Sequence, residues 1–270
     1  MKSSLRENID HDARDPDYIE RTNPSLLKIG RRYFRSEVRG FDNIPKEQAA
    51  LLVGNHSGGF FIMDSFIFAT ELYAHFGAKF RFYALIHDFV RHFPGYPIVR
   101  KFGAVAAKPE NAAALLKTGA KLLVYPGGEY ETFRPFWQAN KIEFAGRKGF
   151  IKLALAENVP IVPVVAIGGQ ETALFLSRGE RLARWFGLDK LLRMKVMSIS
   201  FGFPFGFSVL DFPPRIPLPA KITIQVLPPI DLRQRFGKEP NLDQAYDYIT
   251  SEMQRALDEL ASERKFPVIG

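Results

Sequence analysis

The stretch AALLVGNHSGG, residues 49–59, joins a continuous apolar run to a glycine-bounded loop that carries a histidine. The run Ala49–Gly54 has the length and apolar character of a fully buried strand, as found in parallel sheets. His56 follows this run almost directly, with Gly58 and Gly59 behind it. A buried strand that opens into such a loop indicates an α/β fold with its chemistry at the end of the strand.

Strand-like and helix-like segments alternate from about residue 50 to residue 166. Helices are expected at 64–75, 109–118 and 149–157. Strands are expected at 49–54, 80–85, 103–107, 122–125 and 160–166. This alternation predicts βαβ units and a mostly parallel central sheet flanked by helices, in a single α/β domain. The loops that begin at Asn55, Lys108, Gly127 and Gly168 would then leave strands at one edge, where ligands bind in such sheets.

The two ends of the chain differ in pattern from this central region. Residues 1–23 are polar and are expected to be loosely ordered, so the α/β domain is placed at 24–270. A helix is expected to begin at Pro24, and a second amphipathic helix, 241–260, closes the chain. Residues 178–195 interleave basic side chains with Leu, Trp and Phe, the profile of an interfacial helix. The Phe-rich run 197–210 fits a core strand and an apolar surface equally well.

Composition narrows the class of protein. A hydrophobic content of 46% excludes a disordered chain, and the net charge of +8 favours anionic headgroups, phosphate-bearing substrates or nucleic acid. The absence of cysteine excludes disulfides, thiolate zinc sites and a cysteine nucleophile. No Gly-x-Ser-x-Gly elbow and no nucleic-acid-binding motif occurs. Neither a signal peptide nor an apolar run of about 18 residues is present, which predicts a cytoplasmic protein without a transmembrane helix.

His56 is the residue of the first loop that suits acid–base chemistry. To act as a base toward a hydroxyl, it needs a pKa near neutrality and a carboxylate on its other ring nitrogen. Asp64 is the candidate for that carboxylate, since it would hold the tautomer and stabilise the imidazolium. The residues alone leave two other roles open: Asp64 as a helix N-cap, and His56 as a loop histidine bonded to a backbone carbonyl.

Further blocks follow the His56 block in order along the chain. They are Ala106-Ala107-Lys108-Pro109-Glu110-Asn111, Tyr125-Pro126-Gly127-Gly128 and Val159-Pro160-Ile161-Val162-Pro163. Together with Asn55-His56-Ser57-Gly58-Gly59 and Asp64, they resemble the glycerolipid (lysophospholipid) acyltransferase superfamily over roughly residues 33–232. The branch that includes monoacylglycerol and diacylglycerol acyltransferases is the most similar. The resemblance implies an acyltransferase-like fold in which His56 and Asp64 are catalytic.

The resemblance also implies a set of substrate-binding residues. Lys108 falls near the family's basic position, where it would neutralise a phosphate of the acceptor or of coenzyme A. The backbone at Gly127 and Gly128 would approach the substrate closely, and its amides would stabilise an oxyanion. An acceptor hydroxyl would be held by Glu129 or Glu131. The remaining predicted contacts are the first loop and a basic rim: Ser57, Gly58, Gly59, Arg134, Arg147 and Lys148. An ordinary Pro-Gly-Gly turn and solvated surface charges would give the same pattern.

The chain departs from the family pattern in two places. Seven residues separate His56 from Asp64, where the family has four. On a straight helix the two would lie about 12 Å apart, so they can meet only if the chain folds back at the glycine pair. The third block continues Pro126-Gly127-Gly128-Glu129-Tyr130-Glu131, where phosphatidic-acid-forming members usually have Glu-Gly-Thr-Arg after the proline.

These observations predict an acyltransferase that moves a fatty-acyl group from acyl-CoA or acyl carrier protein to a lipid hydroxyl, with His56 as general base. No metal and no bound cofactor are expected. The expected partners are the thioester donor, the lipid acceptor and the cytoplasmic surface of a membrane, without nucleic acid. The alternative is a non-catalytic, membrane-associated lipid-binding protein of the same fold, which the spacing of His56 and Asp64 favours.

Overall fold

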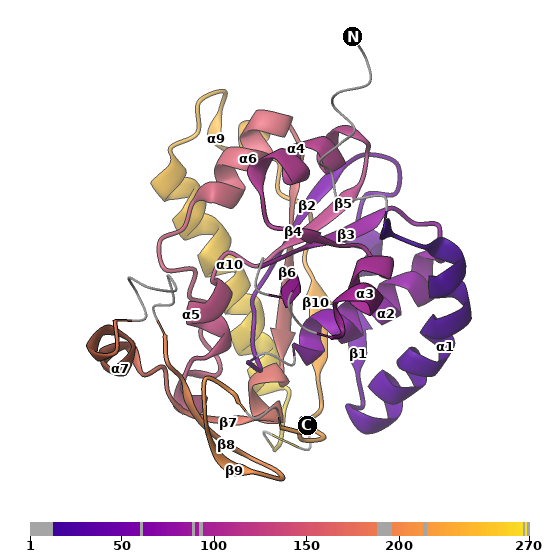
Figure 1. Ribbon diagram of the computed structural model, residues 1–270. Helices are drawn as coiled ribbons and strands as arrows, with labels where there is room; N and C mark the ends of the chain where they lie inside the picture. The colour runs from indigo at the N-terminus through magenta and orange to yellow at the C-terminus, as the bar shows by residue number, and fades with distance from the viewer. Residues whose placement is uncertain are drawn as a thin grey trace.

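A seven-stranded sheet forms the centre of the protein in a computed structural model that describes residues 13–59, 62–87, 90–91, 94–187, 196–212, 215–266 and 268 (Figure 1). In spatial order its strands are β1 (Glu37–Arg39), β10 (Thr223–Val226), β6 (Ile161–Ile167), β2 (Ala50–Gly54), β5 (Lys121–Val124), β3 (Phe82–Ile86) and β4 (Ala104–Ala106). The run from β6 to β4 is parallel, and β10 joins β6 in antiparallel register. The predicted mostly parallel sheet is therefore confirmed.

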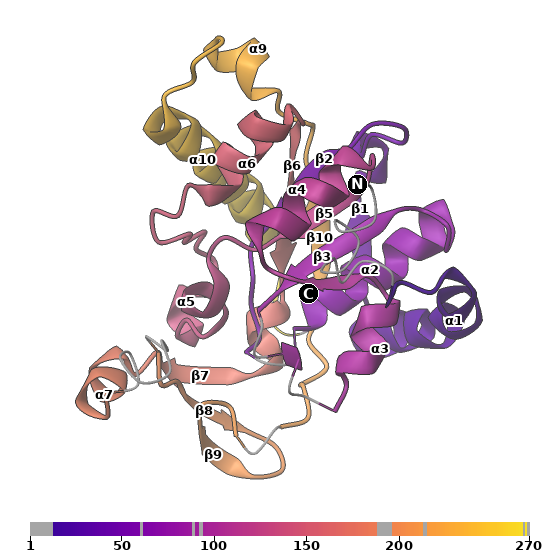
Figure 2. The ribbon, with the colours of Figure 1, turned by 45° about the horizontal axis from the view of Figure 1, so that its top comes forward.

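Helices cover both faces of this sheet, because successive strand residues point to opposite sides. Ala50 and Leu52 pack on the side of α1 and α2, whereas Leu51 and Val53 pack on the side of α4, α6 and α10 (Figure 2). The helices are α1 (Pro16–Tyr33), α2 (Met63–Phe76), α3 (Tyr96–Lys101), α4 (Pro109–Lys117), α5 (Gly128–Thr132), α6 (Gly149–Glu157), α7 (Glu180–Trp185), α9 (Leu232–Phe236) and α10 (Leu242–Ser262). Short 3-10 turns are η2 (Phe41–Asn43), η4 (Phe136–Gln138) and η5 (Gly169–Thr172).

The first helix begins earlier than the sequence predicts. Asp15 caps α1 by accepting a hydrogen bond of 2.9 Å from the Tyr18 N–H, and Pro16 opens the first turn. Pro24 therefore lies inside α1 rather than at its start. The expectation of a loosely ordered segment is wrong for residues 16–23, because the buried Asn23 side chain donates to the Thr70 carbonyl and fastens α1 to α2. Residues 1–12 lie outside the described residues.

A second sheet lies beyond the carboxyl ends of the parallel strands (Figure 1). It is antiparallel, with the order β7 (Leu174–Ser177), β8 (Ile199–Gly202) and β9 (Gly206–Val209). Of the interfacial helix expected at 178–195, the part that falls within the described residues 178–187 contains the helix α7, Glu180–Trp185, and residues 188–195 lie outside the described residues. Within the described part of the chain, no helix is both long and apolar enough to cross a membrane.

Candidate active site

His56 lies in the loop that leaves β2 at the carboxyl edge of the sheet, between β5 and β6. Its backbone N–H donates to Glu131 Oε2 at 2.9 Å, and its carbonyl oxygen accepts from Arg134 Nη2 at 3.3 Å. The preceding Asn55 side chain forms two hydrogen bonds with the backbone of Ala166 in β6, of 2.8 Å and 2.7 Å. These bonds hold the loop to the structures that follow β5 and to β6, so the position of the histidine is fixed from both sides.

The chain folds back between His56 and Asp64. Gly58 and Gly59 both have left-handed backbone conformations, with φ of 92° and 71°, which glycine adopts without strain. Asp64 then falls in the first turn of α2, whose N-cap is Ile62, so Asp64 does not cap that helix. His56 Nδ1 lies 3.8 Å from Asp64 Oδ1, even though seven residues intervene in the sequence.

The Asp64 carboxylate is buried and held by its neighbours. Its Oδ2 accepts from both the backbone N–H and the hydroxyl of Ser57 at 3.1 Å, and its Oδ1 accepts from the Ser65 N–H at 2.6 Å. Burial raises the pKa of Asp64 to about 6, while these donors act in the opposite direction. At neutral pH the Asp64 carboxyl group is therefore mostly ionised, with Oδ1 at 3.8 Å from His56 Nδ1.

The imidazole of His56 lies in a largely dry environment. Its ring stacks on Tyr125, with 4.0 Å between centroids and 21° between planes, and the residue is 7% exposed. Burial, followed by the positive charge of Arg134, lowers the pKa of His56 to about 3. The imidazole is therefore neutral at physiological pH, but its pKa lies well below the near-neutral value expected of a general base. At 3.8 Å from Asp64 Oδ1, His56 Nδ1 is beyond hydrogen-bonding distance, and it has no hydrogen-bond partner among the described residues.

Glu131 and Arg134, both predicted to contact substrate, form a buried pair beneath the His56 loop. Their side chains are fully buried, and Arg134 Nη1 donates to Glu131 Oε1 at 3.1 Å. Glu131 Oε1 also accepts from the Glu143 N–H at 3.2 Å. Burial raises the pKa of Glu131 to about 7, with Arg134 acting against that rise. Both side chains thus form hydrogen bonds with the backbone of His56, whereas the sequence predicts Glu131 at the acceptor site and Arg134 on a basic rim.

The loop after β5 is organised by Arg147. Its Nη1 donates to the carbonyl oxygens of Pro126 and Gly127 at 3.1 Å and 2.9 Å, and its Nη2 donates to Glu129 at 3.0 Å. The N–H of Gly128 donates to the Tyr125 carbonyl at 3.2 Å. The amide of Gly128 is therefore engaged in a turn.

The two predicted lysines are not brought to the His56 loop. Lys108 is exposed at the start of α4, after β4, and β5 and β3 separate β4 from β2 in the sheet. Lys148 forms an ion pair with Asp243 at the N-terminal end of α10. The positions of Lys108 and Lys148 are those of ordinary surface lysines, away from the His56 loop.

Three residues near His56 were not predicted as site residues. Tyr125 stacks on the ring, and its hydroxyl accepts from Ser65 Oγ at 2.7 Å. Gln170, after β6, accepts from the Gly58 N–H at 3.4 Å and donates to the Arg134 carbonyl. The buried Arg215 donates to the Gly58 carbonyl at 2.8 Å. The position of Gln170 just after a parallel strand could have indicated it, whereas nothing in the sequence indicated Arg215.

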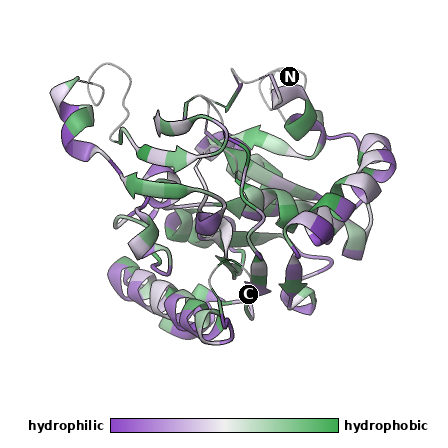
Figure 3. Cartoon of the chain, turned by 90° about the horizontal axis from the view of Figure 1, so that it is seen from below, coloured by the Kyte–Doolittle hydropathy of each residue, from purple (hydrophilic) through white to green (hydrophobic). Residues whose placement is uncertain are grey.

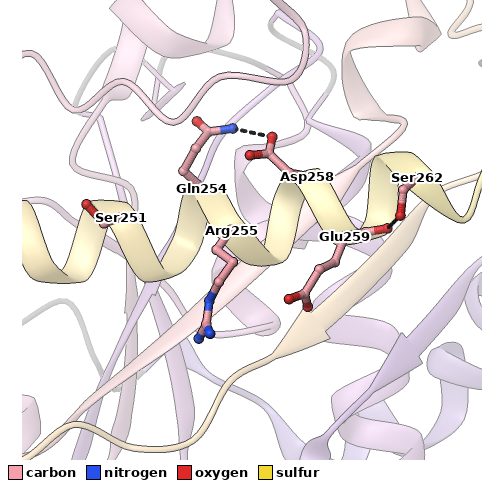
Figure 4. A pocket seen from close by; sticks show the side chains of 6 residues that line it. All are labelled: Ser251, Gln254, Arg255, Asp258, Glu259 and Ser262. Carbon is pink, nitrogen blue, oxygen red and sulfur yellow. Dashed lines mark hydrogen bonds between the residues drawn. The ribbon is translucent and has the colours of Figure 1, made fainter.

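A hollow elsewhere on the surface is polar and belongs to one helix. It is lined by Ser251, Gln254, Arg255, Asp258, Glu259 and Ser262, all on α10 (Figure 4). Gln254 donates to Asp258, one turn farther along the same helix, at 2.8 Å (Figure 4). None of these residues belongs to the His56 loop or to the loops that hold it, so we do not include the hollow in the candidate site.

Comparisons with known proteins identify the family that this chain resembles. Residues 35–167 match a family model described as acyltransferase. The chain is 31% identical to a Bos taurus protein named DGAT1/2-independent enzyme synthesizing storage lipids, over 71% of this chain and 55% of the relative. It is 33% identical to an uncharacterized protein of Mycobacterium tuberculosis, over 61% of this chain and 46% of that protein. The matches thus span about half the length of these curated relatives.

A solved structure shares the fold. The crystal structure of the 1-acyl-sn-glycerophosphate (LPA) acyltransferase PlsC from Thermotoga maritima superposes with a TM-score of 0.55. The match covers 90% of this chain and 81% of that chain, at 18% sequence identity. At 18% identity this similarity shows a shared fold and does not identify the substrates of this chain.

Proposed function

Because the chain belongs to the acyltransferase superfamily, we propose that it transfers a fatty-acyl group from a thioester to a hydroxyl of a glycerolipid or related lipid. The observation that carries this proposal is the approach of His56 Nδ1 to the buried Asp64 carboxylate, at 3.8 Å. A neutral imidazole beside a carboxylate, once the two close to hydrogen-bonding distance, is the arrangement that activates a hydroxyl for attack on an acyl group.

In the proposed reaction, His56 Nε2 takes the proton of the acceptor hydroxyl as its oxygen attacks the thioester carbonyl carbon. Asp64 stabilises the imidazolium that forms, and the low dielectric of the buried site strengthens this attraction. The tetrahedral intermediate then collapses, the carbon–sulfur bond breaks, and the imidazolium returns its proton to the leaving sulfur. The products are an ester and a free thiol, and neither a metal nor a bound cofactor takes part.

We propose acyl-CoA or acyl carrier protein as the donor and a neutral lipid hydroxyl as the preferred acceptor. Support for a neutral acceptor comes from the two predicted arginines of the third loop, because Arg134 is buried against Glu131 and Arg147 is engaged with Glu129. Relatives named for storage-lipid synthesis are consistent with this choice. We place the reaction at the cytoplasmic surface of a membrane, as the composition of the chain suggests.

The alternative of a non-catalytic lipid-binding protein depended on the long spacing between His56 and Asp64. The folded chain brings the two side chains near each other in spite of that spacing. We therefore prefer the enzymatic proposal.

The test is acyl transfer by the wild-type chain from a long-chain acyl-CoA to a panel of acceptors: monoacylglycerol, diacylglycerol, lysophospholipid and a long-chain alcohol. The proposal expects an esterified product from at least one acceptor, with monoacylglycerol or diacylglycerol ahead of lysophospholipid. Binding of these lipids without any product, with acyl-CoA and acyl carrier protein both tried as donors, would favour the lipid-binding alternative.

A further inference from the structure

The β8–β9 hairpin has its polar and apolar faces inverted. In a half-buried antiparallel sheet, apolar side chains normally face the interior and polar ones face water. Here Ser200 and Ser208 are buried and hydrogen-bonded to each other at 2.8 Å, while their strand neighbours Phe201 and Phe207 are exposed. Phe201 and Phe207 are directly paired across the strands and their rings pack together, with centroids 5.2 Å apart.

The exposed apolar surface extends well beyond this pair. Phe203, in the turn of the hairpin, is 65% exposed, and Phe207 is 71% exposed. Other large apolar side chains exposed on this sheet and on the segment after it are Leu174, Phe205, Val209, Phe212, Ile216 and Leu218. We call this set, with Phe201, Phe203 and Phe207, the aromatic face. Seen from below, the strands of this region are largely green beside the partly purple helix α7 (Figure 3). An apolar area of this kind marks an interaction site.

Basic residues accompany aromatic ones on α7, the helix that follows β7. Trp185 is 78% exposed, Phe186 is also exposed, and Arg181 and Arg184 are exposed on the same short helix. Exposed tryptophan and arginine side by side suit the boundary between acyl chains and anionic headgroups. This charge complementarity selects an anionic lipid surface as the partner over a purely apolar protein groove.

The inner side of the same sheet is tied to the His56 loop. Arg215 donates to the Gly58 carbonyl, forms an ion pair with Asp211, and stacks on Phe175 of β7 with its guanidinium carbon 4.9 Å from the ring centroid. A methyl group added at Gly59 would lie only 2.6 Å from the Phe175 ring. The sheet therefore contacts the candidate catalytic loop on one side and exposes the aromatic face on the other.

We propose that the aromatic face, flanked by Arg181 and Arg184 of α7, docks the protein on the surface of an anionic phospholipid bilayer. Docking there holds the carboxyl edge of the main sheet, with the His56 loop, against the membrane from which a lipid acceptor would come. The choice of acceptor rests on the proposed function, but the docking itself does not require catalysis.

The test is flotation of the full chain with vesicles of equimolar phosphatidylcholine and phosphatidylglycerol, and with vesicles of phosphatidylcholine alone. We expect the wild type to float with the anionic vesicles and the Phe203→Ser/Phe207→Ser variant to bind them about 100-fold less tightly, or about 10-fold for each side chain. Arg181→Ala/Arg184→Ala should weaken binding to the anionic vesicles about 5-fold per residue and leave binding to phosphatidylcholine unchanged. Circular dichroism of each variant establishes that it is folded.

The control is Ile29→Ser, which removes an apolar side chain that is 51% exposed from the basic helix α1. Flotation of this variant should equal that of the wild type. Loss of flotation in Ile29→Ser with full flotation of the Phe variant would transfer docking to α1 and overturn the proposal. No vesicle binding by the wild type, with the Phe variant converting a dimer to a monomer in sedimentation, would identify a second copy as the occupant. His56→Ala should float like the wild type, so a failure of acyl transfer and a failure of docking are distinguishable.

Discussion

The buried Glu131–Arg134 pair gives the sharpest stability prediction. Glu131→Gln keeps the shape of the side chain but removes its charge. The native carboxylate accepts three hydrogen bonds, from the His56 N–H at 2.9 Å, Arg134 Nη1 at 3.1 Å and the Glu143 N–H at 3.2 Å. An amide has one oxygen and one NH2 group, so in either orientation its NH2 group faces a donor.

The expected cost follows from what the substitution leaves behind. Arg134 would remain a buried guanidinium without its carboxylate, and removing one partner of a buried ion pair costs about 3–5 kcal/mol. Arg134→Met should cost a similar amount, because it leaves Glu131 without its counter-charge. The double variant Glu131→Gln/Arg134→Met leaves neither charge buried, so its loss should be at least about 1 kcal/mol smaller than the sum of the single losses.

The assay is urea unfolding monitored by circular dichroism at a pH of about 8.5, above the raised pKa of Glu131 of about 7, so that the native side chain is ionised. Glu129→Gln is the matched control, since Glu129 forms a pair with Arg147 in which both side chains are more than a third exposed. That control should lose less than about 1 kcal/mol. The reasoning is refuted if Glu131→Gln is no less stable than Glu129→Gln, or if the two single losses simply add in the double variant.

Three further predictions concern Asp64 and Gly169. Because burial raises the pKa of Asp64 to about 6, the rate of acyl transfer should decline as the pH falls through about 6, where the carboxylate becomes protonated and no longer stabilises the imidazolium. The Asp64→Asn variant should be slower than the wild type and should not show this decline at low pH. An identical pH profile in the two proteins would count against the pairing of Asp64 with His56. Because the pKa of Asp64 is higher in the folded than in the unfolded chain, its protonation stabilises the fold fully at a pH below 3.8, the usual pKa of the group. This contribution is lost as the pH rises through about 6. The unfolding free energy of Asp64→Asn, relative to that of the wild type, should therefore increase between these two pH values. Gly169→Ala would place a methyl group 2.2 Å from Ser57 Oγ and should cost about 1–3 kcal/mol in urea unfolding, whereas Gly149→Ala, which meets nothing within 4 Å, should be neutral; equal costs would contradict the packing argument.

The parallel sheet was predictable because its central strands are short apolar runs, of which β2 ends in Gly54 and β6 is followed by Gly168. Ala50–Gly54 in β2 and Ile161–Ile167 in β6 are buried along their whole lengths, and their sequences contain almost no polar residue. The start of α1 was mispredicted because Pro24 normally begins or ends a helix. The competing pattern, Asp15 before Pro16, was present, but tertiary packing of Asn23 on α2 decided the outcome.

The candidate site was predictable only in part. His56 stood out as a histidine at a strand end, and the glycine pair indicated that the chain could fold back toward Asp64. The burial of Arg134 could not be foreseen, because a charged side chain is normally placed at the surface unless its partner is known. Tyr125 and Arg215 reach His56 and its loop through the tertiary fold, and contacts between such distant positions leave no local pattern.

The exposure of the aromatic face could not be predicted from the sequence either. The Phe-rich run 197–210 has the composition of a core, and sequence alone could not separate a core from an apolar surface. The alternation of the paired strands decides it, since Ser200 and Ser208 occupy the inward positions and Phe201 and Phe207 the outward ones. The register of β8 against β9 thus determines that the Phe side chains, and not the Ser side chains, face water.

The most direct measurement of the central claim is thiol release from acyl-CoA in the presence of acceptor lipid by wild type, His56→Ala and His75→Ala. The chain contains no cysteine, so a thiol reagent reports the leaving group without background from the protein. If His56 is the general base, His56→Ala should lose at least about 100-fold in acceptor-dependent rate while remaining folded, and His75→Ala should retain the wild-type rate. A wild-type rate in His56→Ala would contradict the account.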